Sequence, residues 1–112
     1  MSSLSERLKA IHSELSTLHS TAAPQLQQQL LQCQSLFQKI VAQLAASDLT
    51  PEIEQRVRPA QTEAHRLLRL MGVDGLRLAA AKRPETLAKL RAQLLTQTES
   101  LQGFVQVIFD VL

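Results

Sequence analysis

Few side chains in this sequence could act as metal ligands or nucleophiles. It contains three histidines, His12, His19 and His65, and a single cysteine, Cys33. His12 and His19 are seven residues apart, which on one helix is two turns or about 10.5 Å, too far for them to share a metal ion. Cys33 lies among apolar residues at helical spacing, a position typical of a buried structural thiol. We therefore expect no metal site, and packing as the role of Cys33.

His65 is the histidine whose neighbours could support chemistry. It is followed in the same stretch by Arg66, Arg69, Gly72 and Gly75. This arrangement resembles that of histidine phosphotransfer domains, which are four-helix bundles with an exposed histidine. Leu68 stands where those domains carry a phosphate-binding lysine, and Arg69 stands where they carry a small residue. Two alternatives remain for His65: a phosphotransfer histidine, or a partly exposed structural one.

Motifs of common enzyme classes are missing. The sequence has no G-x-S-x-G nucleophile motif and no G-x-x-x-x-G-K phosphate loop. We therefore expect a protein that is not an enzyme, with no catalytic residues and no cofactor.

The remaining residues are typical of helices. The sequence has 21 Leu and 14 Gln, both good helix formers, against 3 Gly and 4 Pro. Apolar residues recur every three or four positions at 3–20, 24–46, 50–82 and from 84 onward. Short turns between these stretches favour antiparallel neighbours. The sequence predicts an all-α fold, with residues 1–112 forming a single helical domain. Its predicted architecture is an antiparallel up-down-up-down four-helix bundle with a long hairpin formed by the third and fourth helices.

Local signals mark where these helices begin. Ser3 with Glu6 three residues later is typical of a capping box, and Thr50 before Pro51 is typical of a capped helix start. Within the stretch 50–82, Pro59 removes a backbone hydrogen bond and is expected to bend the helix. In the stretch 24–46, the apolar stripe is predicted to be widened by Leu31, Leu36 and Val41.

The helix at 50–82 is longer than the helix at 24–46. If the two are flush at their shared turn, the longer one passes the end of the shorter one near Asp74. Residues 75–91 are then expected to project from the bundle, with Gly75 allowing close approach of the fourth helix. Asp74 is expected to pair with Arg77 or with a basic residue of the fourth helix.

This predicted hairpin concentrates the positive charge of the chain. The net charge is only +2, yet residues 76–92 hold five basic residues and one acidic residue. The basic residues are Arg77, Lys82, Arg83, Lys89 and Arg91. No aromatic residue lies between 75 and 91 to stack on a base, so an acidic protein partner is favoured over nucleic acid. We predict that these five residues bind a protein partner.

Two weakly charged surfaces favour self-association. The helix at 24–46 has an outer face rich in glutamine, including Gln28 and Gln32, and seven of the nine residues from Phe104 to Leu112 are apolar. The centres of protein interfaces are depleted in charge. We therefore expect a homodimer with Gln28, Gln32, Phe109 and Leu112 in its interface.

The sequence also carries signals about its compartment. A single cysteine cannot form an internal disulfide, and neither a secretory leader nor a membrane-spanning apolar run is apparent. We expect a cytoplasmic protein that does not bind membranes.

The hairpin region carries a family resemblance. The residues concerned are Glu63, Arg66, Leu67, Leu68, Arg69, Leu70, Asp74, Leu78, Ala81, Lys82, Arg83, Thr86, Arg91 and Leu94. In this pattern the chain resembles the cyanobacterial PatD family of heterocyst frequency control proteins, which are small and all-helical. The resemblance implies binding to the tubulin-like division protein FtsZ, with an influence on FtsZ assembly and thereby on cell division and heterocyst commitment. Two alternatives stay open: a histidine phosphotransfer protein that uses His65, and a generic dimeric helical scaffold for another partner.

Overall fold

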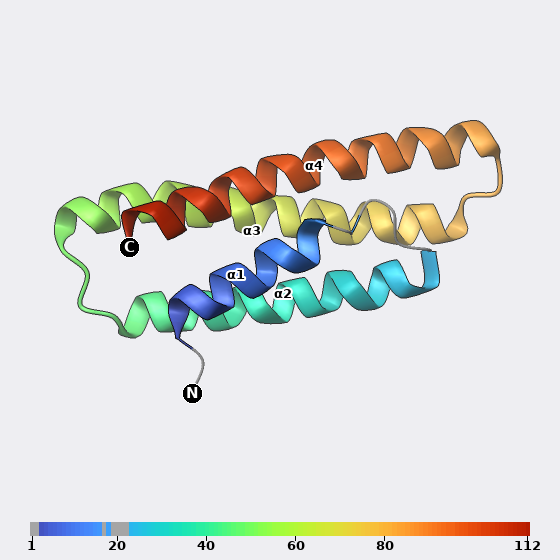
Figure 1. Cartoon of the computed structure of the whole chain (residues 1–112). Helices are drawn as coiled ribbons and strands as arrows, with labels where there is room; N and C mark the ends of the chain where they lie inside the picture. Colours follow the sequence, from blue (N-terminus) through green and yellow to red (C-terminus); the bar gives the residue numbers. More distant parts are fainter. Residues whose placement is uncertain (1–2, 17, 19–22) are drawn as a thin grey trace.

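The residues that the structure describes form four α-helices (Figure 1). The computed structural model describes residues 3–16, 18 and 23–112. The helices are α1 (Leu4–Ser16), α2 (Ala23–Ala46), α3 (Pro51–Ala80) and α4 (Pro84–Val111). No β-strand occurs in this described part of the chain. The predicted all-α class and the number of helices are therefore confirmed.

The helix ends differ slightly from those predicted. The predicted end of the first helix at 20, and with it His19, lies outside the described residues. α3 ends at Ala80 instead of 82, because Ala81 and Arg83 both have extended backbone conformations. An extended conformation at Arg83 is expected, since Pro84 clashes with a helical residue before it.

The predicted helix caps are confirmed by hydrogen bonds. The Glu6 amide donates to Ser3 Oγ at 3.1 Å, and the Ser3 amide donates to Glu6 Oε2 at 3.4 Å. At the start of α3, the Ile53 amide donates to Thr50 Oγ1 at 3.3 Å. These bonds satisfy donors that have no partner within the helix. α3 continues as one helix through Pro59.

The apolar stripes of the four helices meet in one core. α2 and α4 each lie next to both α1 and α3, whereas in the described part of the chain the backbone of α1 does not come close to that of α3, nor that of α2 to that of α4. The side chains with no or almost no exposure include Ile11, Leu15, Cys33, Phe37, Ile40, Met71, Leu94 and Ile108. The molecule is elongated, measuring 50 × 26 × 17 Å.

Gly75 shows that the projecting hairpin was predicted wrongly. Its position is buried, and a Cβ there would lie 2.7 Å from Leu30 Cδ1 of α2. Leu26 of α2 and Leu78 of α3 are also buried, so α2 still covers α3 beyond Asp74. The prediction placed the end of α2 too early because it assumed that α2 and α3 are flush at their shared turn. Gly75 therefore allows close approach of α2, not of α4.

Two glycines give opposite expectations for stability. Replacing Gly103 with alanine is expected to stabilise the protein by about 0.5–1 kcal/mol, because alanine favours a helix interior and nothing lies within 4 Å of the new Cβ. Gly75→Leu is expected to destabilise it by ~1–3 kcal/mol, because the larger side chain must displace Leu30. Urea unfolding followed by circular dichroism measures both changes. A Gly75→Leu protein as stable as the unmodified chain would contradict the close contact.

α1 is the shortest helix and is attached to its neighbours at three backbone oxygens. Arg7 Nη1 donates to the oxygen of Lys39 at 3.4 Å, and Gln29 Nε2 donates to the oxygen of Glu14 at 3.0 Å. On the other side, Gln102 Nε2 of α4 donates to the oxygen of His12 at 3.5 Å. α1 is therefore bonded to α2 on one side and to α4 on the other.

Candidate partner-binding site

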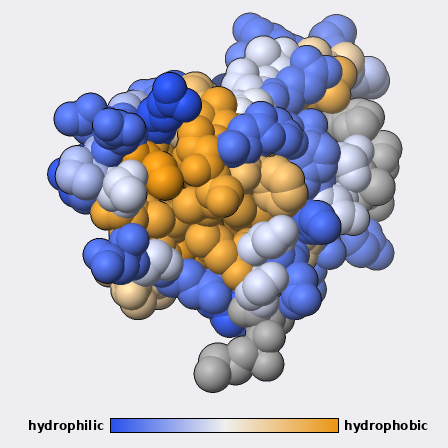
Figure 2. Space-filling model, turned by 60° about the vertical axis from the view of Figure 1, so that its left-hand side comes forward, coloured by the Kyte–Doolittle hydropathy of each residue, from blue (hydrophilic) through white to orange (hydrophobic). Residues whose placement is uncertain are grey.

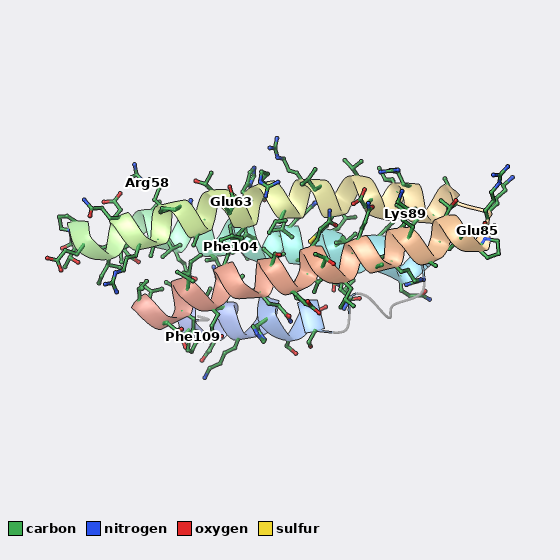
Figure 3. All side chains as sticks on the ribbon, turned by 90° about the horizontal axis from the view of Figure 1, so that it is seen from above. Arg58, Glu63, Glu85, Lys89, Phe104 and Phe109 are labelled. Carbon is green, nitrogen blue, oxygen red and sulfur yellow. The ribbon has the colours of Figure 1, made fainter. Side chains whose placement is uncertain are left out.

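The predicted basic residues gather partly at one end of the bundle. Lys82 and Arg83 lie in the connection between α3 and α4, and Lys89 lies near the beginning of α4 (Figures 1 and 3). All three side chains are exposed, and none takes part in the ion pairs found among the described residues. Glu85 is the single acidic residue of this stretch. We refer to Lys82, Arg83 and Lys89 as the basic tip.

Arg77 and Arg91 are placed differently from the basic tip. Arg77 Nη1 lies 3.3 Å from Asp74 Oδ1, which confirms the predicted pair. From α4, the partner of Asp74 is not a basic residue but Gln97, whose Nε2 donates to Asp74 Oδ2 at 3.0 Å. The Asp74 side chain is only 12% exposed, so it links α3 to α4. Arg91 is half-buried. Three of the five predicted residues thus form one fully exposed group.

His65 lies on the outside of α3, beside α2. It lines a depression of about 160 Å³ together with Gln34, Phe37, Gln38, Leu68 and Arg69. The centres of the His65 and Phe37 rings are 6.5 Å apart, and the rings are tilted by 34°. Leu68 is buried, while His65 and Arg69 are exposed. The imidazole is thus accessible, with a guanidinium one turn away.

Cys33 is fully buried in α2, as predicted. Burial is the main cause that raises the pKa of its thiol to about 12, and the negative charge of Glu14 on α1 adds to the effect. The thiolate, which is the reactive form, is therefore strongly disfavoured in the folded protein.

The predicted dimer residues lie on two separate helices. Gln28 and Gln32 are exposed on α2, whereas Phe109 and Leu112 lie at the end of α4, where Phe109 is half-buried beside α1 (Figure 3). Figure 2 shows an apolar surface at the end of the molecule that contains the connection between α2 and α3. Partly buried apolar residues near this end include Leu4, Leu49, Ile53, Phe109 and Val111, and Leu112 is 50% exposed. The two glutamines and the end of α4 do not form one patch, because Gln28 and Gln32 lie near the beginning of α2, whereas α4 ends beside the first turns of α3, at the other end of the bundle.

Two kinds of feature are absent from the residues that the structure describes. No three side chains of His, Cys, Asp or Glu are grouped there so that they could hold a metal ion. Within the same residues, no helix is both long enough and apolar enough to cross a membrane.

Comparison with known proteins adds no assignment. No protein family, curated protein or solved structure matches this sequence. The resemblance to the PatD family therefore depends only on the residues quoted for it, and what it implies stays a proposal.

One exposed apolar surface on α2 and α3 was not predicted from the sequence. Leu31 was predicted to widen the buried stripe of α2, but its side chain is 59% exposed, whereas Leu36 and Val41 pack partly against the core. On α3, Val73 and Leu76 are 55% and 62% exposed. The spacing of the sequence contained the signal for the two α3 residues. Val73 lies between the buried Met71 and Gly75, and Leu76 lies between the buried Gly75 and Leu78, so both are off the apolar stripe.

Proposed function

We propose that this protein is a non-enzymatic adaptor that binds a protein partner through its basic tip. The observation that carries the proposal is the group of three exposed cations, Lys82, Arg83 and Lys89, at one end of the bundle. Charge of this kind speeds the encounter with an acidic surface and fixes its orientation. In this proposal the chain is a cytoplasmic, antiparallel up-down-up-down bundle that presents the tip at the end of its α3–α4 hairpin.

FtsZ is the partner that we propose, on the basis of the resemblance to the PatD family. Binding at the tip would modulate FtsZ assembly, and through it cell division and heterocyst commitment in a cyanobacterium. The basic tip supports this proposal, since Lys82 and Arg83 belong both to the resemblance and to the exposed group.

Charge reversal at the tip tests this proposal. The triple variant Lys82→Glu, Arg83→Glu and Lys89→Glu is expected to weaken binding to purified FtsZ at least ~10-fold, because attraction becomes repulsion at the contact. Co-sedimentation with FtsZ polymers and light scattering measure binding and assembly. The matched control reverses Lys9, Lys39 and Arg56, which are exposed on other parts of the molecule and give the same net charge. Equal binding by the two triple variants would exclude the tip, and no binding by the unmodified chain would exclude FtsZ.

A second candidate function is phosphotransfer through His65. Its support is the exposed imidazole in a depression with the Arg69 guanidinium nearby. The test is transfer of labelled phosphate from a phosphorylated response-regulator receiver domain or from a histidine kinase to this chain. Label that is lost in His65→Ala but kept in His12→Ala would favour phosphotransfer over the adaptor function. Failure to label the unmodified chain would exclude this candidate for the donors tested.

We also propose a homodimer through the apolar end of α4. Leu112 is half exposed and Phe109 half-buried, at the apolar end of the bundle (Figure 2). We expect sedimentation equilibrium at about 100 μM to give twice the mass of the 12.4 kDa chain, because association depends on concentration. Leu112→Asp is expected to give a monomer, whereas Gln28→Glu tests the amide face separately. A monomeric unmodified chain would contradict the proposal.

A further inference from the structure

The most exposed large apolar side chains of the described residues lie on neighbouring parts of α2 and α3. They are Leu31 on α2 and Val73 and Leu76 on α3. Leu31 and Leu76 directly follow Leu30 and Gly75, which are in close contact, since a Cβ on Gly75 would lie 2.7 Å from Leu30 Cδ1. The exposed leucines therefore flank this contact at the same level of the bundle.

The same surface continues toward His65. Residues three or four positions apart share one face of a helix, which places Gln34 and Gln38 in line with Leu31. On α3 the same spacing joins His65 and Arg69 to Val73 and Leu76. Gln34, Gln38, His65 and Arg69 line one depression, and Gln34 Nε2 donates to the oxygen of Leu68 at 3.4 Å across the two helices. We call the seven residues Leu31, Gln34, Gln38, His65, Arg69, Val73 and Leu76 the α2–α3 strip.

The charges around the strip are positive. α2 contains no acidic residue. On α3, the acidic residues nearest to the strip are Glu63 and Asp74, and both are paired, with Arg66 and Arg77 respectively. Arg69 lies on one side of the leucines along α3, and Lys82 and Arg83 follow α3 on the other side. The strip thus has an apolar centre between two positive ends.

This distribution decides which occupant fits. In a two-fold pair of strips, the positive ends of one copy would meet positive ends of the other in either orientation, and like charges that face each other oppose association. A segment with apolar residues in its centre and carboxylates at both ends is complementary. An amphipathic helix supplies apolar side chains at three- and four-residue spacing, which is the spacing of the strip itself.

We propose that the α2–α3 strip binds an acidic amphipathic helix of a partner protein. Leucines or similar residues of that helix contact Leu31, Val73 and Leu76, and its carboxylates pair with Arg69 at one end and with Lys82 and Arg83 at the other. The proposal deepens the adaptor function and rests on it through the shared residues Lys82 and Arg83. Its own determinants are Leu31, Leu76 and Arg69.

A synthetic helix tests the strip without FtsZ. The probe is a fluorescent peptide of about 18 residues, long enough to span the strip, with leucines at helical spacing in its centre and glutamates in both end turns. A second peptide has glutamine in place of every glutamate. Fluorescence anisotropy with the full chain at low salt is expected to show saturable binding of the glutamate peptide and at least ~10-fold weaker binding of the glutamine peptide.

Substitutions in the α2–α3 strip test which of its side chains contact the peptide. Leu31→Ser with Leu76→Ser is expected to weaken binding of the glutamate peptide at least ~10-fold, because two apolar contacts are lost. Arg69→Glu is expected to weaken it at low salt and much less at high salt. The matched control is Leu95→Ser with Val107→Ser, which removes exposed apolar side chains of α4 and should leave binding unchanged.

Several results would overturn the inference. They are absence of saturable binding, equal binding of the two peptides, or equal losses in the strip variant and the α4 control. Self-association of the unmodified chain that Leu31→Ser with Leu76→Ser abolishes would assign the strip to a second copy instead. The same double variant could lose peptide binding and still bind FtsZ. This result would support both the strip and the proposed function, and it would show that FtsZ binds at another surface. Peptide binding without FtsZ binding would keep the strip and remove FtsZ as the partner.

Discussion

Replacing Phe37 with alanine is expected to lower the free energy of unfolding by about 3–5 kcal/mol. Phe37 is 2% exposed and is the largest of the buried side chains in α2. Its removal loses apolar burial and leaves a cavity that the surrounding helices fill only in part. Domains of this size are typically stable by about 5–15 kcal/mol, so the variant is expected to lose a large part of its stability. Urea unfolding followed by circular dichroism gives the change.

A matched control for Phe37 lies six residues earlier in the same helix. Leu31→Ala removes an apolar side chain that is 59% exposed, and it is expected to change the stability by no more than about 0.5 kcal/mol. Phe37→Leu keeps most of the volume and is expected to cost less than Phe37→Ala. Similar losses for Leu31→Ala and Phe37→Ala would contradict the burial of Phe37.

The second large effect concerns the reactivity of Cys33. Because its pKa is raised to about 12, only ~1 in 10,000 molecules carries the thiolate at pH 8 in the folded state. In an unfolded chain, where the thiol has its ordinary pKa of 9.0, about a tenth of the thiols are thiolate at the same pH. We expect a disulfide reagent to modify native Cys33 at least ~1,000-fold more slowly than the unfolded chain, and a reaction in guanidinium chloride provides the reference.

The raised pKa of the Cys33 thiol also determines how the stability of the protein changes with pH. The folded chain keeps the thiol proton up to about pH 12, whereas the unfolded chain loses it near pH 9. The contribution of Cys33 to stability is therefore complete below about pH 9 and is lost as the pH rises from there toward 12. Cys33→Ala is expected to show a smaller loss of stability between pH 8 and about pH 10 than the unmodified chain. Fast native labelling, or identical pH profiles for the two proteins, would contradict this expectation.

The sequence predicted the elements of this fold because their signals are local. The capping pair of Ser3 and Glu6 and the Thr50 cap depend on residues three positions apart, and the structure contains both. The level at which α2 meets α3 is not a local property. Helix lengths alone do not determine this level, and the contact of Leu30 with Gly75 shows that α2 and α3 are not flush at their shared turn. Burial of that glycine beside α2 depends on the packing of two long helices, which no single stretch of sequence specifies.

The candidate sites were predictable to a similar extent. The distribution of charges along the sequence was enough to locate the basic tip. It did not show that Arg91 is half-buried, and it left open whether Asp74 pairs with Arg77 or with a residue of α4. The exposed leucines were harder to predict, because Leu31 lies next to the buried Leu30 and continues an apolar run. Whether a leucine beside a stripe is covered depends on how closely the next helix approaches, and this distance is set by Gly75 on another helix.

Because α1 packs only at the edge of the three longer helices, between α2 and α4, it can unfold separately from them. α1 has 13 residues, too few for an isolated helix to persist in water, so its helicity depends on its docking. The three longer helices contact one another in the order α2, α3, α4 without it. Excursions in which α1 undocks while the hairpins stay folded therefore cost less free energy than global unfolding. We therefore expect the amide protons of α1 to exchange before those of α3.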